Sequence, residues 1–253
     1  MHGHNGFLTA TLLGLGLLLL DRRPLLAGLL LGALVYKPQV ALLIGPLLLA
    51  TRNWRALGSA TLSAGGLVAV TILLWGWPVW GAFLHPLDLT KRIVGEPGNT
   101  GCEKIVSPFA AIRLWGVATP FAFGVQFAAT ILAIGIALWA AIQARPAMRN
   151  AAAAAATIVS TPYALDYDLV VVGIGIAFFV ADARRTGWRI WEKTALALIW
   201  CSPLFGRAVA QSTLIPLNLM SAMLLLGLVV TRITSERPLT ASPFRRSHAV
   251  SAQ

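Results

Sequence analysis

The sequence has little charge for its length. Only 11% of its 253 residues are charged, whereas 57% are hydrophobic and the mean hydropathy is +0.76. A soluble core cannot hide that much apolar surface, which excludes a water-soluble globular domain. The apolar runs are continuous and do not alternate with a period of two, which excludes a transmembrane β-barrel. The sequence therefore predicts an all-α, polytopic membrane protein.

Several patterns that carry chemistry are also missing. The two cysteines, Cys102 and Cys201, are far apart and lack metal-ligand spacing, so they support neither a zinc site nor a disulfide framework. No glycine-rich phosphate loop, Cys/His metal motif or nucleophile elbow is present. We therefore expect neither a metal ion nor a cofactor.

Acidic residues are scarce, with 9 Asp and Glu against 20 Lys and Arg. In a soluble protein this excess would suggest nucleic acid as a partner. Here the arginines cluster between apolar runs, which is typical of cytoplasmic loops and makes nucleic-acid binding a poor interpretation. No basic region precedes the first apolar run, Phe7–Leu20, so no cleavable signal peptide is expected, and Arg22 and Arg23 place the end of that run in the cytoplasm. The expected location is the bacterial inner (plasma) membrane, with multiple passes and a cytoplasmic C-terminus.

The chain divides into apolar segments of helical length within one membrane domain, residues 1–231. They are Gly6–Leu20, Pro24–Tyr36, Gln39–Ala50, Arg55–Trp75, Pro120–Ala144, Ala151–Leu165, Leu169–Ala181, Thr194–Phe205 and Thr213–Thr231. We expect about eight or nine transmembrane or short helices. Residues 76–119 form one outer loop, in which residues 107–116 suit a short interfacial helix. Residues 232–253 are predicted to be a disordered cytoplasmic tail.

Two polar breaks interrupt otherwise lipid-like sequence. One is Tyr36–Gln39, which contains Lys37 and Pro38, and the other is Tyr163–Asp168. If the helices ran through these breaks, Lys37 and two aspartates would lie in the bilayer at about 2.5–3.5 kcal/mol each on insertion scales. Two prolines would also remove hydrogen bonds inside helices. Counting the basic residues in the loops does not decide between the topologies, but these penalties favour turns at the outer face. The resulting half-length helices are tolerable only where they are surrounded by protein or line a wet cavity, and we expect them to form the wall of a cavity open to the outer face.

Lys37 is the sharpest single signal. Its ammonium group could hold a phosphate as a point charge, with Tyr36 and Gln39 as polar neighbours. The alternative is a lysine that extends to the lipid head groups while its stem packs on lipid or protein. Intramembrane ionisable residues usually mark a site or a pathway, which keeps the two interpretations level.

The second break offers two carboxylates and two tyrosines, which could bind a sugar, a cation or a proton. Its candidate site residues are Tyr163, Asp166 and Tyr167, and Asp166 is also the only candidate for a catalytic role. We expect one aspartate to cap the helix that follows, and Asp168 is the nearer to its start at Leu169. His4 and Asn5 form a third polar group on the same face, for which a plain terminal cap is the alternative.

The order of these elements resembles glycosyltransferase family 87. The matching stretches are residues 3–8, residues 26–39 with their Lys-Pro-Gln element, Trp54-Arg55, Trp80, and Ser160–Asp168. The resemblance covers most of the chain, and it implies the multi-helix membrane architecture called GT-C. It also implies a polyprenyl-phosphate-linked sugar as donor at the outer face. Lys37 would lie near the donor phosphate, and Asp166 and Tyr167 would border the cavity.

The sequence departs from the family pattern in one respect. The family's presumed catalytic aspartate lies in a first outer loop that no residue here matches, family members are longer, and glutamine is commoner at the position of His4. We therefore expect the C-terminal portion of an inverting glycosyltransferase, which supplies the cation and the cavity, or a degenerate homologue. The alternatives are a transporter or flippase-like protein, with Lys37 and Asp166 or Asp168 as an ion relay, and a non-catalytic membrane subunit.

Overall fold

The computed structural model describes residues 5–82 and 101–235, and its regular structure in these ranges is helical. The α-helices are α1 (Gly6–Leu19), α2 (Pro24–Gly32), α3 (Pro38–Ala41), α4 (Ile44–Ala50), α5 (Trp54–Trp75), α7 (Pro108–Leu114), α8 (Thr119–Gln143), α9 (Pro146–Ser160), α10 (Val170–Thr186), α11 (Glu192–Thr213) and α12 (Leu217–Ser235). Short 3₁₀ helices follow α2 (η1, Ala33–Tyr36) and precede α7 (η2, Cys102–Lys104) and α10 (η3, Asp166–Leu169). The predicted all-α class is confirmed.

Three helices, α5, α8 and α12, are long and apolar enough to cross a membrane, and shorter apolar helices accompany them. Large apolar side chains on the outer surface remain exposed, among them Leu73 at 83%, Leu204 at 77% and Leu132 at 65%. Tryptophans are also exposed at both ends of α5, Trp54 at 64% and Trp75 at 65%, as expected for an interfacial aromatic belt. The surface is that of a membrane protein.

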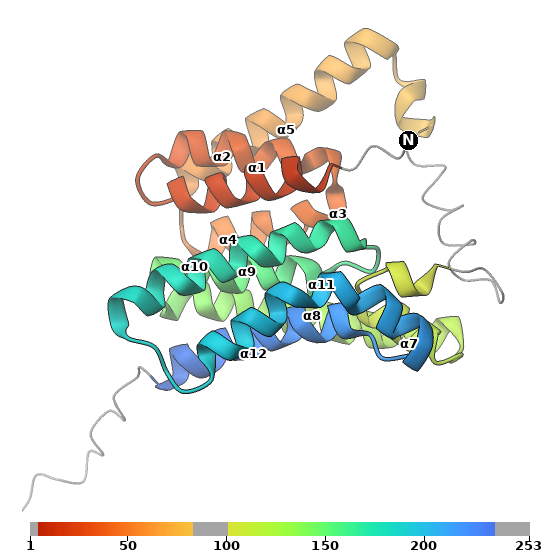
Figure 1. The fold of residues 1–253 in the computed structure, drawn as a ribbon. Coiled ribbons are helices and arrows are strands. Elements are labelled where there is room, and N and C mark those ends of the chain that lie inside the picture. The colour runs from red at the N-terminus through yellow and green to blue at the C-terminus, as the bar shows by residue number, and fades with distance from the viewer. Residues whose placement is uncertain (1–4, 83–100, 236–253) are drawn as a thin grey trace, which may run out of the picture.

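The helices run back and forth between two ends of the molecule (Figure 1). At one end, the Asn53 and Asn150 side-chain amides donate to the carbonyls of Leu20 and Leu17, each at 3.0 Å, so the starts of α5 and α9 lie beside the end of α1. At the other end, the start of α1 meets the Tyr36 side chain through Thr9, with 2.8 Å between the hydroxyl oxygens. The chain therefore turns at both predicted breaks, and both turns lie at the end opposite the arginine-rich loops.

Proline explains where these helices stop. Lys37, which precedes Pro38, has φ −127° and ψ 73°, outside the helical region, and Pro38 begins α3. Thr161, which precedes Pro162, is extended, so α9 ends at Ser160 and not at the expected Leu165. The predicted segment Gln39–Ala50 is two helices, because Pro46 has no N–H to donate to the carbonyl four residues earlier. This extra break, together with α7, gives more helices than the predicted eight or nine.

The packing depends on small side chains. The glycines of α2 lie directly on the backbone of α5, where a Cβ at Gly28 or Gly32 would collide with the carbonyl of Ala56 or Ala60. Helix α9 is the centre of the second half of the chain, packed by α8, α10 and α12, and the alanine run 151–156 is fully buried in it. Helix α7 lies within residues 107–116, where a short interfacial helix was expected, and the backbone N–H of Phe109 donates to the Gln126 side chain of α8 at 3.1 Å.

Helix α12 continues past the expected domain end at residue 231 as far as Ser235. Arg232, assigned by the sequence to the tail, is 1% exposed and binds the carboxylates of Glu192 and Asp182. The helix continues because these buried ion pairs hold its last turn. The rest of the predicted tail lies outside the described residues, as does the part of the predicted outer loop between residues 83 and 100.

Candidate functional site

The two predicted breaks meet at a buried ion pair. Lys37 Nζ lies 2.5 Å from Asp168 Oδ1, and the two side chains are 8% and 4% exposed. The Tyr167 ring covers the same ammonium group, with its centroid 4.9 Å from Nζ. A lysine extended into lipid head groups would be solvated, so this burial excludes the snorkelling alternative. The sequence identified both breaks but gave no sign that these two residues pair.

Asp168 has two partners. Its Oδ1 accepts from Lys37, and its Oδ2 accepts from the backbone N–H of Leu165 at 3.2 Å. The predicted capping role is therefore present in a different form, because Asp168 reaches back to the start of η3 and does not cap the helix after Leu169. Asp168 also has a second role, because its charge compensates a buried ammonium group.

Asp166 faces a different neighbour. Its Oδ1 accepts from the side-chain amide of Asn218 on α12 at 3.2 Å. Burial raises the pKa of the Asp166 carboxyl, and the hydrogen bond from Asn218 opposes this shift. Asn218 is 6% exposed, and no described residue donates to its Oδ1. Sequence reasoning missed Asn218, although a polar amide within the apolar segment 213–231 was a usable signal.

The start of α1 packs against both breaks, next to the Lys37–Asp168 pair. The Tyr36 hydroxyl is hydrogen-bonded to Thr9, whose hydroxyl also donates to the carbonyl of Asn5 at 3.0 Å. Gly6 lies against the backbone of Tyr167, where a Cβ would collide with the carbonyl oxygen. Asn5 Oδ1 is buried, and no described residue donates to it. The structure thus brings Asn5, Tyr36 and Tyr167 together, while the predicted residue His4 lies outside the described residues.

Two predicted residues stand apart from the ion pair. Tyr163 packs on α7, with its ring centroid 6.3 Å from that of Phe109, and burial raises the pKa of its hydroxyl. Gln39 is half-buried on α3, two residues after Lys37. Neither is placed against Lys37 or Asp166 by a hydrogen bond in the described structure.

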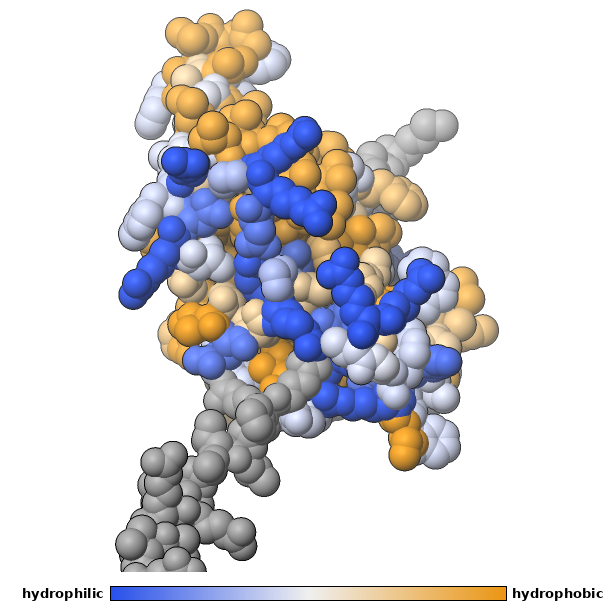
Figure 2. Space-filling view, turned by 90° about the vertical axis from the view of Figure 1, so that its left-hand side faces the viewer, coloured by the Kyte–Doolittle hydropathy of each residue, from blue (hydrophilic) through white to orange (hydrophobic). Residues whose placement is uncertain are grey.

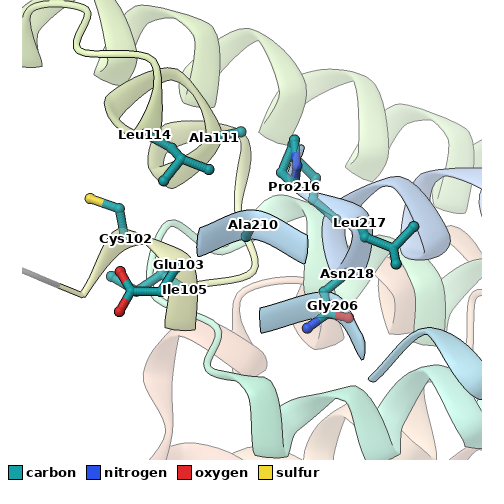
Figure 3. A pocket seen from close by; sticks show the side chains of 11 residues that line it. Cys102, Glu103, Ile105, Ala111, Leu114, Gly206, Ala210, Pro216, Leu217 and Asn218 are labelled. Atoms are coloured by element: carbon teal, nitrogen blue, oxygen red, sulfur yellow. The ribbon is translucent and has the colours of Figure 1, made fainter. Parts of the chain in front are cut away.

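An apolar groove of about 590 Å³ runs between α10 and α11 and reaches Asp166. Its lining contains two polar side chains, Asp166 and Ser221, among Phe7, Leu169, Val170, Val172, Gly173, Ile174, Ile176, Ala177, Ile199, Trp200, Pro203 and Leu204. Asn218, the partner of Asp166, lines a second pocket of about 10 Å³ opposite Cys102 and Glu103 (Figure 3). The second pocket holds one water at most, so the groove is the larger space beside the carboxylate.

Comparison with known proteins decides the family. The sequence model of the family described as glycosyltransferase family 87 matches residues 1–165, about two-thirds of the chain. The chain belongs to glycosyltransferase family 87. No curated protein and no solved structure matches it. The match confirms the resemblance drawn from the Lys-Pro-Gln element, and it includes Lys37 and Tyr163 but stops one residue before Asp166. Membership makes this a membrane glycosyltransferase in general terms, with a sugar donor as substrate.

Proposed function

We propose that this family 87 protein acts in the transfer of mannose or another hexose from a polyprenyl-phosphate donor at the outer face of the bacterial plasma membrane. The observation that carries the proposal is the meeting of the two breaks. A buried ammonium group, two carboxylates and two tyrosines lie together at one end of an otherwise apolar helical bundle. Such groups are expensive in a membrane, and they mark functional positions there.

Lys37 is assigned to the donor phosphate. In an inverting transfer, the acceptor oxygen forms a bond to the sugar carbon and gives its proton to a carboxylate base, while the bond from that carbon to the phosphate oxygen breaks. The departing phosphate gains negative charge, which a nearby cation stabilises. The lysine ammonium group has three N–H donors, and among the described residues it uses one for Asp168, which leaves two for phosphate oxygens.

The groove between α10 and α11 suits the lipid part of the donor. Its walls are apolar along its length, and its polar residues are Asp166 and Ser221. A polyprenyl chain in this groove would place its head group at the end where Asp166 lies. Asp166 would then contact the sugar hydroxyls, held in position by the amide of Asn218. No residue here matches the family's presumed catalytic aspartate, so Asp166 is the candidate for any catalytic role in this chain.

The test is transfer of radiolabelled mannose from polyprenyl-phosphate mannose in membranes that contain the protein, with its abundance measured in parallel. Asp166→Asn should lose transfer at unchanged abundance, because an amide cannot replace the charge. Glu103→Gln, at the neighbouring pocket, is the matched control and should keep transfer. Lys37→Arg should keep part of the activity, since the planar guanidinium fits a phosphate differently.

The role of Lys37 has to be tested in a variant that does not leave the Asp168 carboxylate buried without a cation. Lys37→Met combined with Asp168→Asn removes both charges and should accumulate normally while losing transfer. Full transfer by this double variant would reduce the pair to a structural contact. Proton-coupled solute uptake in proteoliposomes, with no transfer by the unaltered protein, would instead favour the ion-relay alternative for Lys37 and the aspartates.

A further inference from the structure

The end of the molecule opposite the site presents exposed arginines. Hydrophilic side chains gather over this end in Figure 2, which views it face on. Arg22 and Arg23 lie in the loop between α1 and α2, and Arg52 and Arg55 flank the start of α5; all four are exposed. The hydrogen bond from Asn53 to the Leu20 carbonyl holds the two segments side by side. We call these four residues the arginine cluster.

The carboxylates at this end of the molecule bind arginines that are not members of the cluster. In the described chain they are Asp21, Asp182 and Glu192, and each is paired with an arginine outside the cluster. Asp21 accepts two hydrogen bonds from Arg149 at 2.8 and 2.9 Å, Asp182 accepts two from Arg145 at 2.9 Å and one from Arg232, and Glu192 binds Arg232. No carboxylate of the described residues therefore forms an ion pair with the cluster.

Arg52 has a backbone conformation that residues other than glycine rarely adopt. Its φ is 52°, in the left-handed region that favours glycine, just after the end of α4. The N–H groups of Arg52 and Asn53 satisfy the carbonyls of Leu49 and Leu48, at 2.9 and 3.0 Å, as in a glycine-ended helix. Glycines with positive φ also follow α5 and α10, where Gly76 has φ 74° and Gly187 has φ 89°, but their ψ values of 170° and 153° lie outside the left-handed helical region. Trp191 and Leu214 have the same left-handed backbone, so the strain does not by itself mark Arg52 as functional, but it is a strain that glycine at position 52 would relieve.

We propose that the arginine cluster binds the head group of an anionic phospholipid. A guanidinium group donates two parallel hydrogen bonds to a phosphate, a geometry that lysine lacks, and all four members are arginine. Trp54 lies between Arg52 and Arg55 in sequence and is 64% exposed, as suits an indole at head-group depth. The apolar flanks of the bundle place this end at a membrane surface, where basic clusters between helix ends attract anionic lipids. This site does not depend on the proposed transfer reaction.

The experiment measures lipid retention by native mass spectrometry of the full chain, purified with mixtures of phosphatidylglycerol and phosphatidylcholine. The unaltered protein should retain phosphatidylglycerol preferentially. The variant Arg22→Gln/Arg23→Gln/Arg52→Gln/Arg55→Gln should bind it about tenfold more weakly or worse. The matched control is Arg184→Gln/Arg185→Gln, which removes two exposed arginines from the end of α10 and should retain most of the binding.

Arg52→Gly gives an independent readout. Glycine relieves the left-handed backbone, so the thermal midpoint in neutral detergent should rise while phosphatidylglycerol retention falls. If Arg52 had only a structural role, Arg52→Gly would change the thermal midpoint without lowering phosphatidylglycerol retention. Equal retention by the unaltered protein and the fourfold variant would overturn the proposal. So would competition by inorganic phosphate at matched concentration, since that would make the cluster a general anion site.

Discussion

The Lys37–Asp168 pair makes a quantitative prediction about folding. Lys37→Met leaves the Asp168 carboxylate, 4% exposed, without its cation, and breaking a buried pair in this way costs about 3–5 kcal/mol. Asp168→Asn strands the buried ammonium group instead and should also cost about 3–5 kcal/mol, towards the lower end because asparagine still accepts from the Leu165 N–H. The double variant leaves neither charge stranded, so its cost should fall below the sum of the two by about 2–3 kcal/mol.

The measurement is unfolding in mixed detergent micelles, followed by the fluorescence of the protein's 9 tryptophans, for all four corners of the cycle. Because Tyr167 lies on the same ammonium group, it is left unchanged throughout. Costs that add within about 0.5 kcal/mol would refute the reasoning, since independent sites behave that way. In that case the short contact between Nζ and Oδ1 would carry no net coupling.

Three further predictions test the rest of the architecture. Gly32→Ala should destabilise the protein by about 1–3 kcal/mol, because its methyl group meets the Ala60 backbone. Gly58→Ala, where the added methyl group enters open space, should instead stabilise α5 by up to about 1 kcal/mol. The same micelle unfolding assay measures both variants, and equal effects on stability would contradict the observed packing of α2 on α5. Arg232→Gln strands the carboxylates that it binds and should cost about 3–5 kcal/mol, seen as a lower thermal midpoint; an unchanged midpoint would count against the buried network. In a cysteine-free background, Lys104→Cys should react with an impermeant thiol reagent in intact cells and Lys193→Cys only after permeabilisation, and the opposite pattern would reverse the assigned orientation.

Sequence reasoning located the breaks because their signals are local. A proline fixes φ and removes a donor wherever it lies, so the helix before Pro38 ended as expected, whereas Pro162 ended α9 at Ser160, before the expected Leu165. Helix lengths were predicted less well, because hydropathy cannot distinguish a helix end from a helix that continues with buried charges. Helices α9 and α12 extend through Arg149 and Arg232, and both charges are compensated by carboxylates far away in the sequence. Such pairing depends on the tertiary fold.

The pairing of Lys37 with Asp168 and of Asp166 with Asn218 was equally hidden. These partners are separated by 131 and 52 residues, and no periodicity connects them. The sequence predicted a capping role for Asp168 because that residue is nearest the helix start, which is a one-dimensional criterion. In three dimensions, the carboxylate that caps also neutralises the lysine, so one residue has both roles.

The burial of Lys37 narrows what the pair can be for. Buried ion pairs contribute little net stability, and apolar side chains of similar volume often serve a fold as well or better. A chain that needed only a tie between its two hairpins could use the leucines and alanines that fill the rest of its core. Within the described part of the chain, the ammonium group is held by one carboxylate and covered by one tyrosine face, so it is already desolvated and oriented and has two N–H groups left to donate. That is the state in which a cation stabilises a phosphate most strongly, because little reorganisation remains when charge develops. The pair therefore fits a site better than a structural tie.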